Sequence, residues 1–340
     1  MSAWLAIFTL LLSLVGTGLL RKLALRVGLI DVPNSRSMHA VATPRGGGLA
    51  AVVASVAALG ILWSAGAVSS SVVLALAGGI PVAVIGFVDD RRPVSPWLRL
   101  LVHFSAAVWA LAWLGGVPAL QVGAWLVGPH WVLNLLGVLA IVWVLNLFNF
   151  MDGIDGIAAS EAAFMGCAGA LLAATLMDAT GIVACSVAMA MASFGFLVWN
   201  WPPARIFMGD VGSGFLGFWV AVISVESAWH HPSALLAWLI LGSLFFADST
   251  VTLARRLLAG HRPYEAHRTH AYQILARRWG GHLPVTLASI AVNLVWPLPL
   301  AAGALVWPGA AIGLLALAVL PLAGLAWVVG AGRPEQCAID

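Results

Sequence analysis

The chain has 340 residues, of which 62% are hydrophobic and only 9% are charged, and its mean hydropathy is +1.01. These values exclude a water-soluble fold, because an average soluble domain carries about 25% charged residues. Sixteen basic and thirteen acidic residues give a formal net charge of +3, too sparse for a nucleic-acid-binding track. The three cysteines lack the paired spacings of a disulfide framework or a zinc site, so redox chemistry is not expected.

Eleven apolar segments are long enough to cross a bilayer as helices, which takes about 20 residues each. They cover residues 2–20, 48–66, 70–88, 98–116, 130–149, 157–177, 180–200, 212–229, 233–252, 284–306 and 309–330. Gly and Pro turn signals separate most of them. We predict an all-α polytopic membrane bundle of about 11 transmembrane helices. No internal repeat divides the chain, so residues 1–340 are expected to form a single domain.

The basic residues indicate how this bundle is oriented. None precedes the first apolar segment, while Arg21, Lys22 and Arg26 follow it, the reverse of a signal peptide, so the segment is expected to stay as an anchor. When the spans are followed in order, all basic residues fall on one side. The positive-inside rule then puts the N-terminus outside and the C-terminus in the cytoplasm. All acids except Asp178 and Glu226 lie on the same side, so we expect the active site on the cytoplasmic face.

The first cytoplasmic segment, residues 31–48, is rich in groups that bind anions. Arg45 precedes Gly46 to Gly48 at the start of an apolar helix. Backbone N–H groups in such a position can bind a phosphate with the help of the helix dipole. A positively charged loop that simply caps the helix is the alternative explanation.

The second cytoplasmic segment carries two adjacent carboxylates, Asp89 and Asp90, at the end of an apolar run. Two such groups repel each other, so one tends to stay protonated unless a cation or an arginine offsets the charge. Acids perturbed in this way are candidates for functional sites. The alternative is a plain cluster of charges at the membrane interface.

The third cytoplasmic segment presents a stripe of oxygen-bearing side chains. Asn146, Asn149 and Asp152 are each three residues apart, which puts them on one helical face. Amide and carboxylate oxygens suit Mg²⁺, which takes one or two protein ligands and completes its shell with water and substrate phosphates. Asp155 follows in a glycine-rich turn where the backbone can approach a ligand. A turn that merely ends the helix would explain the glycines but not two asparagines inside an apolar segment.

The fourth cytoplasmic segment, residues 202–214, contains Arg205 and a single aspartate, Asp210, among glycines. Asp210 directly precedes an apolar helix. At such a helix start it is well placed to meet a metal ion or a phosphate.

The fifth cytoplasmic segment, residues 255–278, is dominated by arginine and histidine. The spacing of His267 and His270 suits zinc on a helix, but no cysteine or third histidine completes such a site. Together with Arg268 they therefore favour phosphate binding. A purely topological role would explain the arginines but not the histidines. Asp248, near the end of the ninth span, is expected to pair with a neighbouring arginine and to be structural.

Together the segments place carboxylates, asparagines, histidines and arginines at the depth of lipid headgroups. This set suits phosphoryl transfer between two anionic substrates, because a divalent cation and fixed arginines relieve their repulsion. The segments contain no serine or cysteine nucleophile motif, so direct attack without a covalent enzyme intermediate is expected.

Five ordered motifs carry a resemblance that covers most of the chain. They are Asp31 to Gly48, Asp89-Asp90, Asn146 to Gly156, Phe207 to Gly214 and Glu265 to Gln273. On these residues the sequence resembles the polyprenyl-phosphate N-acetylhexosamine-1-phosphate transferases, the MraY/WecA-like membrane family of glycosyltransferase family 4. The stretch Tyr264 to Gln273 looks most similar to the WbpL-like branch, which initiates O-antigen synthesis.

The resemblance implies an enzyme of the bacterial inner membrane that acts on a UDP-sugar and on undecaprenyl phosphate. It would transfer an N-acetylhexosamine 1-phosphate to the lipid and release UMP, with Mg²⁺ as cofactor and Mn²⁺ as an alternative ion. The product would start a lipid-linked O-antigen or another cell-envelope polysaccharide. The transferred sugar stays open among GlcNAc, GalNAc, FucNAc, QuiNAc and related forms. The oligomeric state is open as well, and a homodimer is one possibility.

The resemblance also implies roles for single residues. Asp210 would be the main metal ligand and Asn149 a second one. Asp89 and Asp90 would complete the catalytic set with Asp210, either by deprotonating the lipid phosphate, for which Asp89 is favoured, or by organising metal and substrate. The substrate-binding residues would be Asn146, Asn149, Asp152, Asp155, Arg45, Arg205, His267, Arg268 and His270.

The sequence departs from several relatives after the acidic pair, where Trp97 and Arg99 stand in the stretch that carries a lysine elsewhere. This leaves open which cation serves there. Two other functions compete with the enzyme. A transporter would place its carboxylates near the midplane in two related halves, whereas these cluster at one interface. A non-catalytic assembly protein would use the same loops to bind partners, but it gives no reason for the acids, asparagines and histidines.

Overall fold

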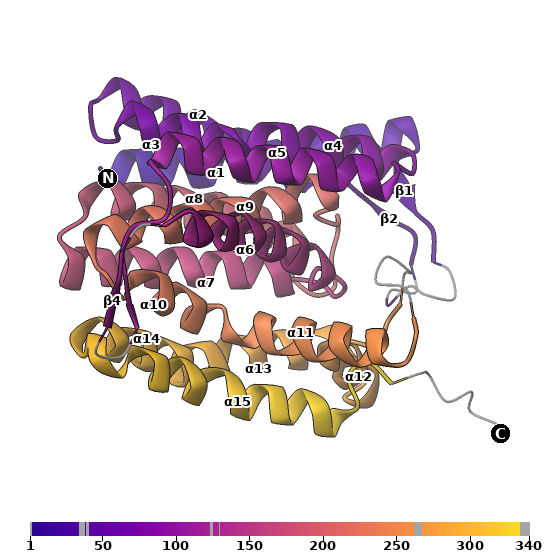
Figure 1. Cartoon of the computed structure of the whole chain (residues 1–340). Coiled ribbons are helices and arrows are strands. Elements are labelled where there is room, and N and C mark those ends of the chain that lie inside the picture. Colours follow the sequence, from indigo (N-terminus) through magenta and orange to yellow (C-terminus); the bar gives the residue numbers. More distant parts are fainter. Residues whose placement is uncertain are drawn as a thin grey trace.

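Helices make up almost all of the computed structural model, which describes residues 2–33, 38, 41–122, 125–128, 130–261 and 267–333 (Figure 1). The helices are α1 (Ala3–Val27), α2 (Gly48–Ser64), α3 (Ser70–Ala77), α4 (Gly79–Arg91), α5 (Pro96–Leu114), α6 (Trp131–Phe150), α7 (Ile157–Leu172), α8 (Thr180–Asn200), α9 (Asp210–His230), α10 (Ala234–Leu241), α11 (Ser243–Leu258), α12 (Ala271–Arg278), α13 (His282–Val295), α14 (Pro297–Val306) and α15 (Ala311–Val329). Two short antiparallel pairs join β1 (Ile30–Asp31) to β2 (Thr43–Pro44) and β3 (Leu120–Val122) to β4 (Trp125–Val127).

The helices confirm the prediction of a polytopic membrane bundle. Among the described residues, nine helical segments are long and apolar enough to cross a membrane, and α10 with α11 forms a tenth that is bent by 71° at Gly242. The one remaining predicted span, residues 48–66, corresponds to α2, an apolar helix of 17 residues. Helices form in these runs because a lipid environment requires each backbone N–H and C=O to be paired within its own segment.

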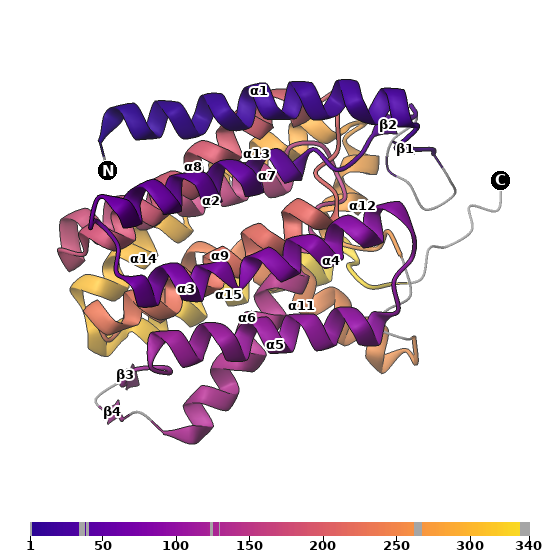
Figure 2. The same ribbon diagram turned by 90° about the horizontal axis from the view of Figure 1, so that it is seen from above.

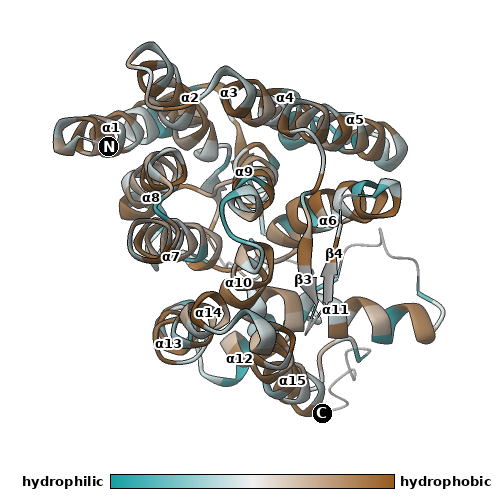
Figure 3. Ribbon diagram, turned by 60° about the vertical axis from the view of Figure 1, so that its left-hand side comes forward, coloured by the Kyte–Doolittle hydropathy of each residue, from teal (hydrophilic) through white to brown (hydrophobic). Residues whose placement is uncertain are grey.

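Burial distinguishes central helices from peripheral ones. Within an 18-residue window, 94% of α9 is buried, against 22% of α1 and of α15. The outer helices expose large apolar side chains, such as Leu11 and Leu19 on α1 and Leu320 and Val328 on α15. Hydrophobic residues predominate along most helices when the bundle is seen nearly along its helices (Figure 3). An exposed apolar surface of this extent suits lipid rather than water.

The polar segments predicted from the sequence gather at one end of the bundle. The ends of α1, α4, α6 and α11 meet the starts of α2, α5, α9 and α12 there, while β3 and β4 lie at the opposite end (Figures 1 and 2). Since α9 runs through the middle of the molecule, its first residue, Asp210, lies at the centre of the polar end. The cytoplasmic orientation of this end stays a prediction.

Candidate active site

Asp90 joins the second and fourth polar segments. Its Oδ1 accepts a hydrogen bond from the backbone N–H of Asp210 at 3.0 Å, and its Oδ2 accepts one from Val211 at 3.2 Å. These N–H groups belong to the first turn of α9, where donors have no partner inside the helix and where the helix dipole favours a negative charge. The side chain of Asp90 is only 1% exposed. Asp90 therefore caps α9 and fixes Asp210 relative to α4.

Two glycines make this contact possible. Gly209 has a φ of +76°, a left-handed conformation that favours glycine, and a Cβ there would meet the carboxylate of Asp90. On α4, a Cβ at Gly86 would lie 2.5 Å from the backbone of Asp210. The two helices thus approach each other through backbone that no other residue type would allow.

Arg99 on α5 joins the other two carboxylates of the predicted catalytic set. Its Nη1 lies 2.5 Å from Oδ2 of Asp89, and its Nη2 lies 3.3 Å from Oδ2 of Asp210. Oδ1 of Asp89 also accepts a hydrogen bond from the backbone N–H of Val94 at 2.7 Å. The repulsion expected between Asp89 and Asp90 is therefore relieved separately, by an arginine for one and by a helix start for the other. Asp89, Asp90 and Asp210 belong to one connected network.

Asn149 and Asp152 of the third segment lie beside this network. Asn149 and Asp210 line the same small cavity, and Nδ2 of Asn149 donates to Oγ of Ser213 at 3.1 Å. Asp152 lies in the turn between α6 and α7. Burial raises the pKa of Asp152 well above its usual range, and the nearby charges of Asp210 and Asp90 raise it further. The structure thus brings the third segment to the second and fourth.

Asn146, one turn further into the bundle, has different partners. Its Nδ2 donates to the carbonyl of Val142 at 2.7 Å and lies 3.4 Å from Nδ1 of His103 on α5. His103 is buried and lines the same cavity as Asn149 and Asp210. The sequence interpretation missed His103, although a histidine four residues after Arg99 inside an apolar span was a legible signal.

The glycine-rich start of α2 does not offer its N–H groups to a ligand in the way the sequence suggested. The backbone N–H of Gly47 donates to the carbonyl of Phe207, and that of Gly48 donates to Met208. A Cβ at Gly48 would lie 2.5 Å from Cα of Gly212, so this glycine permits close packing of α2 on α9. The phosphate-binding interpretation of these two N–H groups is therefore wrong.

Arg45 faces the carboxylate network from the first segment. Its Nη2 lies 3.1 Å from Oδ2 of Asp31, and its Nε lies 3.8 Å from Oδ1 of Asp90. Residues 34–37 and 39–40 of the same predicted motif lie outside the described residues.

Asp155 connects the third segment to the fourth segment directly, and to the first segment through His282. Its Oδ2 accepts a hydrogen bond from the backbone N–H of Ala204 at 3.0 Å and lies 3.2 Å from Nδ1 of His282. Nε2 of the same histidine donates to the carbonyl of Met38 at 3.1 Å. His282, which the sequence interpretation also missed, thus connects the first segment to the third.

Arg205 lies near Trp199 on α8 rather than against the carboxylates named above. Its guanidinium lies 6.0 Å from the ring of Trp199, as does that of Arg21. The backbone carbonyl of Arg205 accepts a hydrogen bond from Nε of Arg21. Its predicted role in substrate binding stays a prediction.

The histidines of the fifth segment stack on each other. The rings of His267 and His270 are 5.0 Å apart, and burial, together with neighbouring cations, lowers the pKa of His267 to about 3. His270 is buried, and its Nδ1 donates to Oδ1 of Asp248 at 3.2 Å. The carbonyl of Arg268 accepts a hydrogen bond from Arg277. Residues 262–266, which include the start of the predicted motif Tyr264 to Gln273, lie outside the described residues.

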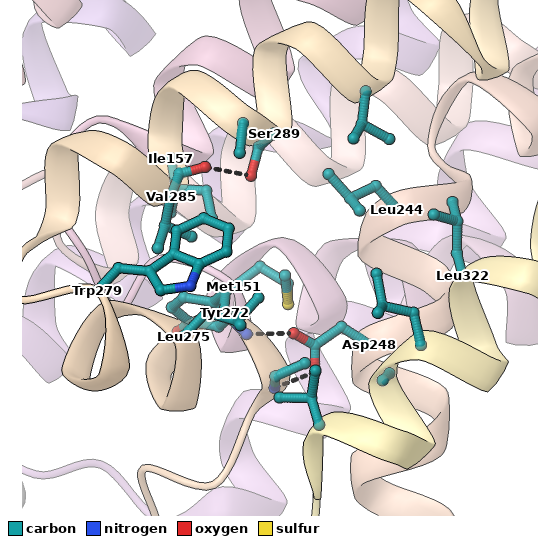
Figure 4. Close-up of a pocket in the computed structure, with 16 residues that line it drawn as sticks. Met151, Ile157, Leu244, Asp248, Tyr272, Leu275, Trp279, Val285, Ser289 and Leu322 are labelled. Atoms are coloured by element: carbon teal, nitrogen blue, oxygen red, sulfur yellow. Dashed lines mark hydrogen bonds between the residues drawn. The ribbon is translucent and has the colours of Figure 1, made fainter.

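Asp248 caps α12, and its ion-pair partner is His270 rather than the arginine expected from the sequence. Its two carboxylate oxygens accept hydrogen bonds from the backbone N–H groups of Ala271 and Tyr272 at 2.9 Å each (Figure 4). Oη of Tyr272 donates to the carbonyl of Phe150 at 3.0 Å. The fifth segment is therefore anchored on the loop that carries Asp152.

A largely apolar pocket lies beside this anchor, between α11, α12, α13 and α15 (Figure 4). Met151, Leu244, Val285 and Leu322 contribute to its wall, and Asp248 lies at its edge. The pocket therefore offers an apolar surface next to the polar end of the bundle.

The donor set at Asp210 fits a magnesium ion better than a multi-ligand transition-metal centre. Within the described ranges, no group of three or more His, Cys, Asp or Glu side chains is arranged to hold a metal. Mg²⁺ does not require one, because one or two protein ligands are usual and water and substrate phosphates complete its shell. The carboxylate of Asp210 and the amide of Asn149 line one cavity and offer the hard oxygen atoms that this ion prefers.

Comparison with known proteins gives the family. Residues 72–228 match the model of Glycosyl transferase family 4. A Bacillus subtilis protein named as a probable undecaprenyl-phosphate N-acetylglucosaminyl 1-phosphate transferase is 30% identical over 264 residues, which cover 74% of this chain and 71% of that protein. The Escherichia coli K12 undecaprenyl-phosphate alpha-N-acetylglucosaminyl 1-phosphate transferase is 29% identical over 280 residues, or 76% and 71% of the two chains. A Moorella thermoacetica phospho-N-acetylmuramoyl-pentapeptide-transferase is 36% identical over 159 residues, or 42% and 49%.

The first two relatives are named for N-acetylglucosamine rather than for the WbpL-like branch. The similarity extends over the span from α3 to α9, which contains all three carboxylates of the network. The chain is a polytopic membrane protein that belongs to glycosyl transferase family 4.

Proposed function

We propose that the protein transfers an N-acetylhexosamine 1-phosphate from a UDP-sugar to undecaprenyl phosphate and releases UMP. The names of the Bacillus and Escherichia relatives support both the type of transfer and the lipid acceptor. The observation that carries the proposal is the network in which Asp90 holds the start of α9 and Arg99 bridges Asp89 and Asp210. Such an arrangement supplies fixed charges where two anionic substrates meet.

In this proposal Asp210 and Asn149 hold a magnesium ion. When bound, Mg²⁺ would polarise the phosphate oxygens and offset the charge of the two substrates. Arg99 contributes a fixed positive charge beside Asp210. Asp90 does not touch the substrates, because both of its oxygens are engaged by α9, so its role is to position Asp210.

An oxygen of the lipid phosphate attacks the sugar-linked phosphorus, and the bond from that phosphorus to the bridging oxygen breaks. UMP leaves with the bridging oxygen. Asp89 is the candidate to accept a proton from the lipid phosphate, because its side chain is 14% exposed against 1% for Asp90, and because its Oδ2 is paired with the side chain of Arg99 rather than with the backbone of α9. No covalent enzyme intermediate is needed, so trapping a phosphorylated or glycosylated Asp89 would contradict this mechanism.

We assign most of the remaining predicted residues to the surroundings of this centre. Asp152 lies near Asp210 and belongs to the proposed nucleotide site, while His267 and Arg268 belong to a loop that would face phosphates. The apolar pocket between α11 and α13 is a candidate path for the first isoprene units of the lipid. Asp155 and His270 would act indirectly, since their side chains hold neighbouring loops.

The sugar and the pathway are the finer part of the proposal. We propose that this transfer initiates O-antigen synthesis, with a 6-deoxy sugar or GlcNAc as the transferred unit. Membranes that contain the protein are incubated with undecaprenyl phosphate, Mg²⁺ and radiolabelled UDP-GlcNAc, UDP-GalNAc, UDP-FucNAc or UDP-QuiNAc. A labelled lipid that forms with one of these, and not with Asp210→Asn membranes, supports the proposal. Absence of labelled lipid with all four, from correctly inserted protein, would overturn it.

A further inference from the structure

A small cavity lies directly beneath the carboxylates, one helical turn further into the bundle. Four helices each line it with the residue one turn inward from their site residue: Gly86 on α4, His103 on α5, Leu145 on α6 and Gly214 on α9. A turn of four residues corresponds to about 6 Å along a helix. The side chains of Arg99, Asn149 and Asp210 line the same cavity from the polar end. The cavity therefore opens below the site and has room for about one water-sized group.

The hydrogen bonds of Asn146 fix the protonation of His103. Nδ2 of Asn146 lies 2.7 Å from the carbonyl of Val142, which can only accept, so this atom is the amide nitrogen. The same nitrogen lies 3.4 Å from Nδ1 of His103 and therefore donates to it. An Nδ1 that accepts carries no proton. The imidazole is then neutral, with its single proton on Nε2.

The Nε2–H of His103 is therefore available to donate a hydrogen bond to a bound ligand. Within the part of the chain that the structure describes, Nε2 of His103 has no protein partner. It is also not one of the fully buried polar atoms that lack a partner, so it can reach the cavity. The ring itself is only 5% exposed and lines the cavity. Arg99 lies four residues earlier on the same face of α5 and adds a charged donor. The carboxylate of Asp210 lines the same space, and Arg99 offsets its charge through an ion pair at 3.3 Å, so the two donors can still bind an oxygen atom that bears negative charge.

We propose that this cavity receives one oxygen of the acceptor lipid's phosphate, bound by Arg99 and by the Nε2–H of His103, and that Asn146 is the positioning residue that holds His103 in this form. The inference rests on the proposed function, since it takes the anion to be a polyprenyl phosphate. The lipid is chosen over the nucleotide because the cavity lies on the bilayer side of Asp210, inward from the loops. The role of Asn146 is thus to set the proton on His103, rather than to bind a metal or a nucleotide.

Two substitutions distinguish a hydrogen-bond donor role of His103 from a role in packing alone. In His103→Gln, the amide oxygen can accept from Asn146 and the amide N–H groups can still donate into the cavity. In His103→Leu, the volume is kept but both functions are lost. Loss of one hydrogen bond to a charged oxygen corresponds to about 10- to 100-fold in affinity. We expect the KM for undecaprenyl phosphate to rise by that factor in His103→Leu and to stay within about 3-fold of the parent in His103→Gln.

Comparing the KM values for the two substrates shows whether the bound phosphate belongs to the lipid or to the UDP-sugar. The KM for the UDP-sugar is expected to stay unchanged in His103→Leu, and the exposed His130 at the opposite end serves as a control through His130→Gln. A selective rise in the KM for the UDP-sugar would contradict the assignment to the lipid. Equal losses in the Gln and Leu variants would contradict a donor role, provided that both variants unfold at the same temperature as the parent.

A second measurement does not depend on activity. The protein is labelled with ¹⁵N-histidine in lipid nanodiscs, and the signals of His103 are assigned from their absence in His103→Gln. We expect an unprotonated Nδ1 and a protonated Nε2 in the parent. In Asn146→Asp the carboxylate accepts rather than donates, so the proton should move to Nδ1. A parent with its proton on Nδ1 overturns the inference even if the enzyme is active, whereas a parent that transfers no sugar phosphate removes the proposed function but leaves this tautomer measurement intact.

Discussion

Asp89 and Asp90 are neighbours in the sequence, but they serve different partners in the structure. Asp90 accepts the first N–H groups of α9, and Asp89 pairs with Arg99. The sequence could predict that two adjacent acids need compensation, because like charges repel at any geometry. It could not predict which acid would become the helix cap. That depends on the approach of α4 to α9, which comes from residues 120 positions apart.

The two acids should therefore respond differently to the same substitution. Asp90→Asn places an amide N–H against a backbone N–H of α9 and leaves a buried donor without a partner, at a cost of about 1–3 kcal/mol of unfolding free energy. Asp89→Asn keeps an oxygen for Val94 and should lower turnover more than stability. Thermal unfolding in detergent and sugar-phosphate transfer are measured on both variants. An Asp90→Asn protein with parental thermal stability would contradict the capping role.

The sequence interpretation missed two site residues, His103 and His282, because little in the local sequence marks them as functional. His103 and His282 each lie in or at the start of an apolar helix, and neither belongs to a run of polar residues. Their importance comes from partners on other elements, Asn146 in one case and Asp155 with Met38 in the other. For His103, a polar side chain inside an apolar span was the only available clue.

At the scale of elements, close packing between helices sets the geometry of the site. The glycines at the start of α2 were predicted as phosphate donors, but their N–H groups pair with the carbonyls of Phe207 and Met208. A glycine before a helix has the same sequence pattern whether its N–H meets a ligand or another loop. The choice depends on which segment arrives beside it, and this is a tertiary property.

This packing predicts a position-dependent effect within one helix. In Gly48→Ala the new Cβ would lie 2.5 Å from Cα of Gly212, so α2 and α9 must shift at a cost of about 1–3 kcal/mol. Gly60→Ala on the same helix is the matched control, because a Cβ there meets nothing within 4 Å. Alanine should be neutral or slightly stabilising at Gly60. Thermal unfolding of the two variants tests the contact, and equal melting temperatures would refute it.

A buried pair connects α7 to α13. Nδ2 of Asn293 donates to Oε2 of Glu161, while Oε1 of Glu161 and Oδ1 of Asn293 are buried acceptors with no donor among the residues that the structure describes. One proton on Oε1 would satisfy both oxygens. Glu161→Gln supplies an N–H in the same place and should keep the parental stability. Asn293→Leu leaves the acid without a partner and should lower the unfolding temperature clearly. A Glu161→Gln protein as unstable as Asn293→Leu would show that the acid is needed in its charged form.

At the scale of the whole molecule, composition and the length of the apolar runs were sufficient to predict a polytopic helical bundle. The predicted spans correspond to the helices because lipid leaves little choice of secondary structure. The breaks were less visible: the predicted span at 70–88 consists of α3 and α4, and the one at 233–252 bends by 71° at Gly242. Such breaks depend on neighbouring helices and not on hydropathy alone.

The orientation of the bundle is a prediction that labelling can test. Single cysteines are introduced at the partly exposed Ser71 and at the exposed Arg92, which lie at opposite ends, in a background without the natural cysteines. In intact cells a membrane-impermeant maleimide should label position 71 once it has crossed the outer barrier, and position 92 only after the membrane is opened. The reverse pattern would place the carboxylates outside and separate them from a cytoplasmic UDP-sugar.

The most direct test of the account is transfer of labelled sugar phosphate by the purified protein in liposomes that contain undecaprenyl phosphate. With the UDP-sugar that gives the highest rate in membranes and with Mg²⁺, the parent should form the labelled lipid and release UMP in equal amounts. Asp210→Ala, reconstituted to the same level, should form almost none. Near-parental, magnesium-dependent transfer by Asp210→Ala would contradict the central claim that this carboxylate holds the magnesium ion that the reacting phosphates need.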